Sequence, residues 1–370
     1  MREHSEHPAY LSDQLITCIG NKRKLLPLLG RGFAWARQRA GKDLLSIADL
    51  FSGSGVVSRY AKHLATYIIA NDMERYAEVI SRCYLSNSSP ELQAAVRADL
   101  ERTRVKVEQQ LREGGIISEL YAPANEGDVR AGERAFYTPR NARFLDAARM
   151  AISDLPAERQ HFLLAPLLSQ ASRHANTGGV FKGFYKNRAG LGQFGGEGRH
   201  ALTRILKPIE LEFPTLSRFH CSYEVHRMDA NALAGQMDRV DLAYIDPPYN
   251  QHPYGSNYFM LNLLCEYKRP RAVSAVSGIP RDWNRSRYNK GREALDALMD
   301  LLRRAPARLI MLSYNDEGLI SRSDLEREIG LLGEWQVIEQ AYNAFRASRN
   351  LNARSVHVHE LLYLIAKQDG

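Results

Sequence analysis

The chain has 370 residues, enough for one large domain or two ordinary domains with a well-buried core. Its formal charge of +8 makes a polyanionic partner plausible without requiring one. The four cysteines are far apart and form no C-x-x-C pair, which argues against a zinc site or a disulfide framework. No apolar run approaches the length of a membrane span. We therefore expect a soluble, cytoplasmic protein that uses no metal.

A basic turn stands near the N-terminus, ahead of an apolar helical stretch. It reads Ile19-Gly20-Asn21-Lys22 and continues with two more cations. Positive charge at the start of a helix opposes the helix dipole, so a nearby anionic group would help to explain it. A solvated basic turn without a ligand is the alternative.

A strand, a glycine-rich turn and a helix come next. The strand covers residues 44–49 and the helix begins at about Val56. The end of the strand and the turn between them contain Asp49, Phe51, Gly53, Ser54 and Gly55. This order is typical of nucleotide-binding α/β folds. The full G-x-G-x-x-G and the P-loop Lys-Ser/Thr are both missing, so a compact nucleoside-type ligand is favoured over a pyrophosphate.

A second strand, residues 67–70, ends at Asn71-Asp72. An acid at the end of the strand after a glycine-rich unit is placed to accept hydrogen bonds from ribose hydroxyls. Asp72 could instead cap the helical segment that follows, and both roles could hold at once.

Residues 79–214 are predicted to be a large insertion. It contains a helix from Ser89-Pro90-Glu91 to a stop at Gly114-Gly115, and helical segments over 141–153 and 160–172. Residues 173–207 then combine seven Lys or Arg and one acid with aromatic residues and glycines. That mixture suits phosphate contacts with base contacts nearby, although a solvated loop is the alternative. The candidate cations include Lys182, Lys186, Arg188 and Arg199.

An apolar strand delivers the most informative motif of the chain. A strand over 223–229, ending at Asp229, precedes it, and residues 242–245 lead into Asp246-Pro247-Pro248-Tyr249. The two prolines lack N–H donors, so this turn offers only acceptors, with a flat ring beside them. Such a turn suits a planar substrate that carries an amino group, for example a nucleobase flipped out of its helix. A strand that merely ends in a proline-rich turn is the alternative.

The C-terminal third supplies a second basic stretch and the last strands. Residues 266–292 hold eight Lys or Arg against two acids, and Arg281, Arg285 and Arg287 are its candidate DNA-binding residues. A helix over 293–304 leads into a strand over 308–315. Two alternating runs, 335–342 and 357–366, are fit to pair antiparallel at a sheet edge. Because strands alternate with helices before this tail, we expect a mostly parallel sheet.

Four of these stretches together resemble the D12 class of adenine-N6 DNA methyltransferases, the Dam-like family with the α arrangement of motifs. The matching pieces are Ile19-Gly20-Asn21-Lys22, residues 49–55, Asn71-Asp72 and Asp246-Pro247-Pro248-Tyr249. Residues 250–258 look like the restriction-modification branch of that class. Residues 184–195 are similar to the family's target-recognition entry, but they lack its Phe-Asn pair and its proline near the closing glycine.

The resemblance implies a Rossmann-like class I methyltransferase fold. Its α/β sheet would have seven strands, mostly parallel, with an antiparallel hairpin at one edge. Residues 1–78 and 215–370 would form the catalytic domain, and 79–214 would be an inserted helical and target-recognition region.

The resemblance also implies S-adenosyl-L-methionine as methyl donor and duplex DNA as substrate. Lys22 would hold the donor's carboxylate, Asp72 its ribose and Asp229 its adenine. Asp246 and the Pro247 carbonyl would accept the two N6 hydrogens of a flipped adenine stacked on Tyr249. The donor site would comprise Ile19, Gly20, Asn21, Lys22, Asp49, Phe51, Gly53, Ser54, Gly55, Asp72, Asp229 and Asp246. The reaction would need no metal and no covalent enzyme intermediate.

Within this class of enzyme, Asp246 favours adenine, since cytosine-N4 enzymes usually carry Ser and glutamine methylases Asn at that position. A bacterial or phage origin and a cognate restriction endonuclease would follow from the resemblance. Two alternatives stay open: an adenine-N6 methyltransferase acting on RNA, and a catalytically inactive DNA-binding protein with the same fold.

Overall fold

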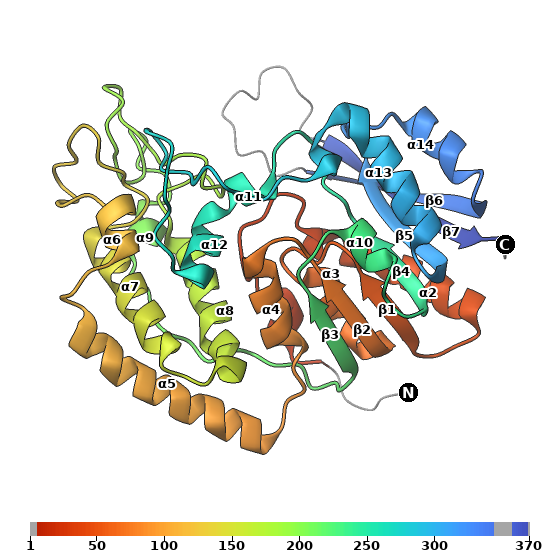
Figure 1. The fold of residues 1–370 in the computed structure, drawn as a ribbon, viewed down its shortest axis with the longest axis horizontal. Coiled ribbons are helices and arrows are strands. Elements are labelled where there is room, and N and C mark those ends of the chain that lie inside the picture. Colours follow the sequence, from red (N-terminus) through yellow and green to blue (C-terminus); the bar gives the residue numbers. More distant parts are fainter. Residues whose placement is uncertain (1–5, 344–356, 369–370) are drawn as a thin grey trace.

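The computed structural model describes residues 6–343 and 357–368. It contains a seven-stranded sheet with the strand order β3-β2-β1-β4-β5-β7-β6, on the right in Figure 1. The strands are β1 (Leu45–Asp49), β2 (Ala65–Asn71), β3 (Ser222–His226), β4 (Val240–Ile245), β5 (Ala307–Asn315), β6 (Gly333–Asn343) and β7 (His357–Lys367). The first five run parallel, while β7 is antiparallel to both β5 and β6. The predicted fold class is confirmed. The strand expected over 223–229 ends earlier, at His226, and Asp229 lies beyond it.

Helices cover both faces of the sheet, which explains why its central strands are apolar throughout. In β4, Leu242 and Tyr244 face the side of α2 (Leu26–Ala40) and α3 (Val56–Ala61). Ala243 and Ile245 face the opposite side, where α10 (Ala230–Ala234), α13 (Gly291–Arg304) and α14 (Arg322–Ile329) pack. Successive side chains of a strand point to opposite faces, so a strand buried on both faces reads as a continuous apolar run.

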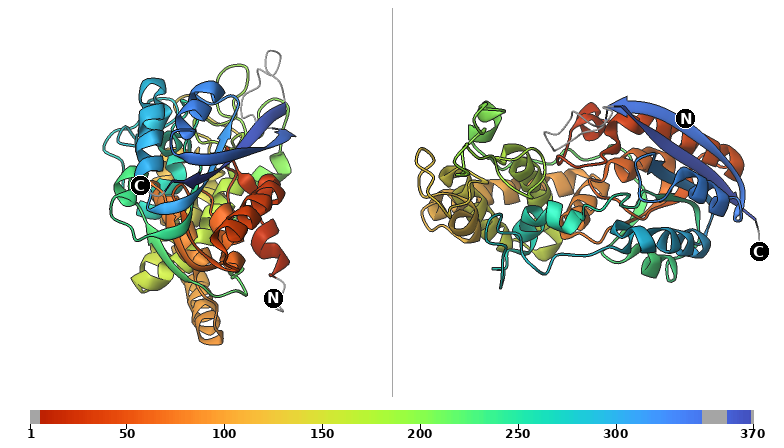
Figure 2. Two further views of the ribbon diagram at one scale, coloured as in Figure 1. Left: turned by 90° about the vertical axis from the view of Figure 1, so that its right-hand side faces the viewer. Right: turned by 90° about the horizontal axis from the view of Figure 1, so that it is seen from above.

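A helical part lies beside the sheet (Figures 1 and 2). It contains α5 (Pro90–Gln110), α6 (Ile116–Tyr121), α7 (Pro139–Ser153), α8 (Ala157–His174) and α9 (Leu202–Leu206). The predicted helix start is confirmed, because the Ser89 hydroxyl accepts from the Leu92 N–H at 3.1 Å and Pro90 begins the helix. This helix ends at Gln110, before the predicted stop at the two glycines.

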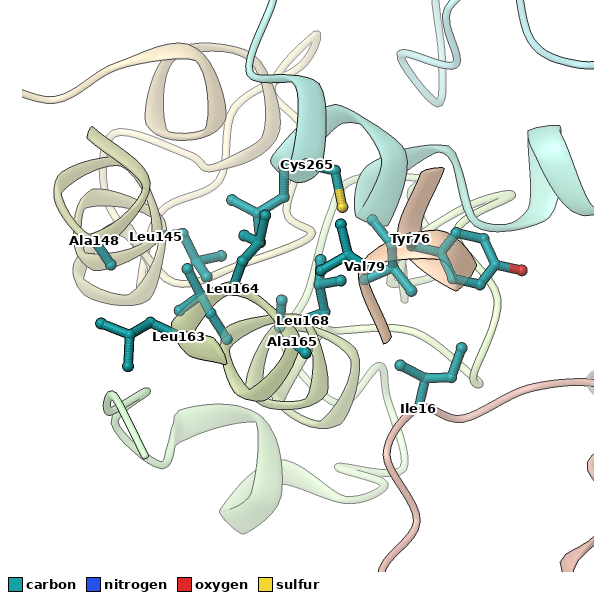
Figure 3. Packing of buried hydrophobic residues seen from close by; sticks show 14 of the residues in the cluster. Ile16, Tyr76, Val79, Leu145, Ala148, Leu163, Leu164, Ala165, Leu168 and Cys265 are labelled. Atoms are coloured by element: carbon teal, nitrogen blue, oxygen red, sulfur yellow. The ribbon is translucent and has the colours of Figure 1, made fainter. Parts of the chain in front are cut away.

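One continuous core joins the helical part to α4 (Arg75–Leu85) and α12 (Phe259–Glu266) (Figure 3). Leu145 and Leu168 of the helical part share it with Tyr76 of α4 and Cys265 of α12. The helices of residues 79–214 are therefore packed against segments from both sides of that range. Among the described residues, no helix has the length and apolarity that a membrane crossing needs.

A buried arginine holds the N-terminal segment that leads to the basic turn. The Arg59 guanidinium of α3 lies between the rings of Tyr10 and Tyr84, 5.6 Å from each centroid. It donates to the backbone carbonyls of Tyr10 and, at 3.3 Å, of Asp13. Tyr10 belongs to the short helix α1 (Pro8–Ser12), and the chain continues from there to the 3-10 turn η1 (Lys22–Leu25). Arg59 thus helps to place Lys22 at the sheet.

Candidate active site

A pocket lies at the carboxyl ends of β1, β2 and β4, the edge of a parallel sheet where ligands bind. Most of the predicted donor-site residues line it: Ile19, Gly20, Asn21, Lys22, Phe51, Gly53, Ser54, Asp72 and Asp246. They come from the four stretches that the sequence pattern singled out, and the fold brings these stretches together. Asp49, Gly55, Asp229, Pro247 and Tyr249 are not among the described residues that line the pocket.

The glycine-rich turn between β1 and α3 is held by Asp72. Gly53 and Gly55 have φ angles of +50° and +72°, in the left-handed region that favours glycine. The Gly53 N–H donates to Asp72 Oδ2 at 2.8 Å, and the Glu74 N–H donates to Asp72 Oδ1 at 2.9 Å. Burial raises the pKa of Asp72, and these backbone donors counteract the effect. Asp72 therefore fixes the turn and the start of the next segment, while its carboxylate still faces the pocket.

Asp49 and Asp229 have structural roles next to the pocket. Asp49, at the end of β1, accepts a hydrogen bond of 2.5 Å from the Ser58 hydroxyl of α3. Burial raises its pKa to about 7. Asp229 caps α10, since its carboxylate accepts from the N–H groups of Asn231 and Ala232 at 3.0 and 3.1 Å.

A buried group of three charges adjoins the pocket, with Lys22 and Asp246 in the pocket lining and Glu360 outside it. The Lys22 ammonium lies 3.0 Å from Asp246 Oδ1 and 2.7 Å from Glu360 Oε1. The side chains of Lys22 and Glu360 are only 4% and 1% exposed, and that of Asp246 is 16% exposed. Burial lowers the pKa of Lys22, but the two carboxylates outweigh it, and the pKa lies well above its ordinary value. The sequence pattern singled out Lys22 and Asp246 but not Glu360, which lies on β7.

The Asp-Pro-Pro-Tyr turn leaves β4 beside this group. Burial raises the pKa of Asp246 to about 6, with Lys22 opposing the shift and Glu360 adding to it. Tyr249 is buried: its ring lies 5.7 Å from the Lys22 ammonium and 6.1 Å, edge-on, from the ring of Tyr314. Pro248 lines the pocket. The turn thus presents a carboxylate next to a cation, backed by two aromatic rings.

A segment of the second basic stretch also reaches the pocket. Residues 281–289, here called the strap, contribute Asn284, Ser286 and Asn289 to the lining. Asn284 donates to the Met73 carbonyl at 3.0 Å and contacts the carboxylate of Glu74, another lining residue. Burial raises the pKa of Glu74 to about 7. One pattern in the sequence could have identified these residues: polar side chains alternate with the strap's arginines.

The predicted DNA-binding cations lie on two loops outside the pocket. The Lys182 ammonium is 3.2 Å from Nδ1 of His252, just past the Asp-Pro-Pro-Tyr turn. Arg188 is 91% exposed and pairs with Glu197 at 3.1 Å. Arg285 of the strap lies 4.3 Å over the ring of Trp283. The remaining candidates, Lys186, Arg199, Arg281 and Arg287, are all exposed.

Comparison with known proteins adds to this geometry. A sequence model of the D12 class N6 adenine-specific DNA methyltransferases matches residues 19–274, more than half of the chain. The chain is 30% identical over 359 residues to the type II methyltransferase M.NlaIII of Neisseria lactamica, covering 94% of this chain and 98% of that protein. It is 27% identical over 355 residues to the type II methyltransferase M.CviAII of Paramecium bursaria Chlorella virus 1, covering 94% and 97%. It is also 27% identical to the modification methylase StsI of Streptococcus sanguinis, of which it spans 52%.

Proposed function

The chain belongs to the D12 class of N6 adenine-specific DNA methyltransferases, and from that premise we propose that it uses S-adenosyl-L-methionine to modify a flipped adenine within one short DNA sequence. The observation that carries the proposal is the pocket itself. It unites the glycine-rich turn and Asp72 with the carboxylate of Asp246. A donor site and an acceptor for an amino group thereby share one cavity.

The pocket fits a nucleoside-type methyl donor. Its lining includes the aromatic residues Phe51 and Tyr76 and the acid Asp72. We infer that Asp72 binds the ribose hydroxyls and that the glycine turn lets the backbone approach the ligand. When bound, the donor supplies a methyl group on a positively charged sulfur.

The remaining donor-site assignments follow the positions of the side chains. Ile19, Gly20, Asn21 and Ser54 would contact the donor directly, because they line the pocket. The Lys22 ammonium has three N–H bonds and forms ion pairs with two carboxylates, those of Asp246 and Glu360, so it could still bind the carboxylate of the methyl donor.

Two predicted residues, Asp49 and Gly55, would act from behind the pocket wall, whereas a third, Asp229, would contact the donor. Asp49 holds α3 through Ser58, and Gly55 lets that helix begin close to Ile80, 3.2 Å from where a Cβ would stand. Asp229 is the proposed contact to the donor's adenine. It lies near Tyr288, whose ring packs edge-on against Phe51 of the pocket.

The Asp-Pro-Pro-Tyr turn would orient the target. The lone pair of an adenine amino nitrogen is delocalised into the ring, and accepting both N6 hydrogens at fixed positions redirects it. Asp246 and the Pro247 carbonyl are the proposed acceptors. Stacking on Tyr249 would contribute about 1–3 kcal/mol, which offsets much of an unstacking cost of a few kcal/mol. Catalysis would then rest on orientation and electrostatics.

DNA would be held by the two basic loops. Lys182, Lys186, Arg188 and Arg199 belong to one, and Arg281, Arg285 and Arg287 to the other. Phosphate contacts of such cations position a duplex, and base contacts select the sequence. We further propose that a restriction endonuclease with the same recognition sequence accompanies this protein, as the type II names of its relatives suggest.

A methyl-transfer assay tests the proposal. Purified protein is incubated with labelled S-adenosyl-L-methionine and unmethylated duplex DNA, and the product is digested to nucleosides. Label in N6-methyladenine is expected, and sequencing of the methylated DNA should show one short motif. Label in RNA but not in DNA would overturn the DNA substrate. Donor binding without transfer to either would indicate an inactive protein with a methylase fold.

A further inference from the structure

Glu360 is the one member of the buried charged group for which the reaction described above has no role. It lies on β7, outside residues 19–274 that the family model matches. The antiparallel course of β7 explains its position. Glu360 pairs in register with Asn315, at the C-terminal end of β5. An antiparallel strand begins where its parallel neighbours end, so an acid near its start reaches the edge that carries Asp246.

Two bridges connect Glu360 to Asp246. The Lys22 ammonium contacts both carboxylates, at 2.7 and 3.0 Å. The Ser313 hydroxyl of β5 donates to Glu360 Oε1 and also hydrogen bonds with the Asp246 carboxyl. A hydroxyl has only one hydrogen to give. The carboxylates of Asp246 and Glu360 therefore compete for the single hydrogen of Ser313.

The charge balance of this group favours the uptake of one proton. Two buried carboxylates share a single ammonium, so the group carries an excess negative charge when both acids are ionised. Like charges that share a site hinder each other's ionisation, and burial strengthens the effect. Both Lys22 and Glu360 are less than a tenth exposed, so solvent screens this repulsion little.

We propose that Glu360 is a positioning residue for methylation: by sharing Lys22 and Ser313 with Asp246, it enables that carboxylate to accept the proton that the target amino group must lose. The inference rests on the proposed function. The amino nitrogen begins with two hydrogens and ends with one hydrogen and one methyl group. Its lone pair forms the new N–C bond while the bond between the methyl group and the donor's sulfur breaks and leaves its electron pair on sulfur. The N–H electron pair returns to nitrogen, and the proton passes to Asp246 and then to solvent.

Other groups also face Asp246 and enter its titration. Besides Lys22 and Glu360, these are Cys18, Asp49, Tyr244, Tyr249 and Tyr254. Burial raises the pKa of Tyr244 and Tyr254 well above their ordinary values and that of Cys18 to about 12, so none of these three ionises near neutral pH. Asp49 titrates near pH 7, but replacing Glu360 leaves it in place. A difference between the profiles of wild type and variant would therefore report on Asp246.

The test is the pH dependence of single-turnover methylation in Glu360→Gln. In the wild type the rate should fall on the acid side with a midpoint near pH 6. The variant should move that midpoint about one pH unit lower, because Asp246 loses a negative neighbour. Its plateau rate should drop about tenfold, because a weaker base accepts the proton less readily. Glu360→Asp keeps the charge and should keep the midpoint.

Controls separate this role from structural damage. Glu334→Gln removes an exposed acid of β6 that pairs with Arg39, and it should leave the profile unchanged. Donor affinity measured by calorimetry should also stay within twofold in Glu360→Gln, because Glu360 is not among the described residues that line the pocket. The Lys22–Asp246 pair remains in this variant, so no buried charge loses its only partner.

The outcomes are distinct. If Glu360→Gln lowers the rate equally at every pH and leaves the acid-side midpoint of the profile unchanged, the inference is overturned and Glu360 is a structural residue. If that variant does not fold, the wild-type profile decides. An acid-side midpoint below about pH 5, near the pKa of an ordinary carboxyl group, would also overturn the inference. Absence of label in adenine at every pH in the wild type would instead overturn the proposed function.

Discussion

Asp246 is the residue at which the geometry constrains the chemistry most strongly. Its carboxylate meets a cation, a hydroxyl and the pocket, and it directly follows the buried strand β4. Residues of this strand alternate between two cores, so the strand end is rigid. A carboxylate fixed in this way can hold an amino group at a defined angle, which a mobile surface acid cannot.

Replacing Asp246 by Ala should reduce the methylation rate by at least about a hundredfold, because the amino group loses its orienting acceptor. Lys22 keeps Glu360 as a partner, so the fold should survive, which calorimetry can check. Asp241→Ala is the matched control, since Asp241 lies at the other end of β4 and pairs with Lys42. Rates within threefold of wild type for Asp246→Ala would remove this carboxylate from the mechanism.

Tyr249 should influence the rate more than DNA affinity. Most of the affinity for DNA comes from phosphate contacts, whereas the ring is expected to stack on the flipped base. Tyr249→Ala should therefore lower single-turnover methylation about tenfold or more and change the DNA dissociation constant by less than threefold. Tyr249→Phe keeps the ring and should retain most of the rate. Equal losses of rate and affinity in the alanine variant would argue against stacking.

At the scale of elements, the sequence pattern was sufficient wherever a local signal dictated the structure. The apolar runs before Asp49 and Asp246 identified β1 and β4, and Ser89-Pro90 identified the start of α5. The sequence pattern could not predict contacts between residues that are distant in the chain. Nothing local places β7 between β5 and β6, and that placement alone brings Glu360 to Lys22.

The strap is the second element that local patterns could not assign. Its positive charge led to the prediction that it binds DNA, yet its polar residues Asn284, Ser286 and Asn289 line the pocket. The anchor is Tyr288, which is buried and donates to Asn231 Oδ1 at 2.8 Å. With Tyr288 fixed, the extended chain before it alternates between the pocket and solvent. One short segment can therefore serve both the donor and DNA.

Substitutions in the strap should separate these two roles. Asn284→Ala should weaken donor binding about tenfold, roughly the loss of one to two hydrogen bonds, with little effect on DNA. Arg285→Ala should leave the donor dissociation constant unchanged and lower the salt dependence of DNA binding by about one unit of slope. Calorimetry and fluorescence anisotropy measure the two. A similar loss of donor affinity in both variants would contradict the inference that side chains of the strap alternate between the pocket and solvent.

At the scale of the whole molecule, the site brings together several acids whose pKa values are raised. Burial raises the pKa of Asp49 and Glu74 to about 7, that of Asp246 to about 6, and that of Asp72. These residues come from strand ends that the sheet brings to one edge. The site thus carries a cost in stability that depends on pH.

The sign of that dependence follows from proton binding. A carboxyl whose pKa is raised in the folded state binds its proton more tightly there than in the unfolded chain. Its contribution to stability is complete below the unfolded value of about 4 and is lost as the pH rises through 6 to 7. His161, whose pKa burial lowers to about 4, His174, whose pKa burial also lowers, and Lys62, whose pKa burial lowers to about 8, act in the opposite direction. The four acids outnumber these three groups.

We therefore expect the ligand-free protein to unfold at a lower temperature at pH 8 than at pH 6, by several degrees. The methylation rate should instead be higher at pH 8 than at pH 6, because Asp246 acts as an ionised acceptor.

Asp49→Asn should raise the unfolding temperature at pH 8 and make the unfolding temperature depend less on pH, since the amide can still accept from Ser58 and carries no buried charge. Asp241→Asn is the control: Lys42 and Ser46 counteract burial and lower the pKa of Asp241, so this variant should leave the dependence between pH 6 and 8 unchanged. Scanning calorimetry across this range measures both. An unfolding temperature that rises from pH 6 to pH 8 in the wild type would contradict this expectation. It would mean that the acids at the sheet edge are already ionised at pH 6, so that any loss of stability caused by the site would come from its geometry and not from its charge.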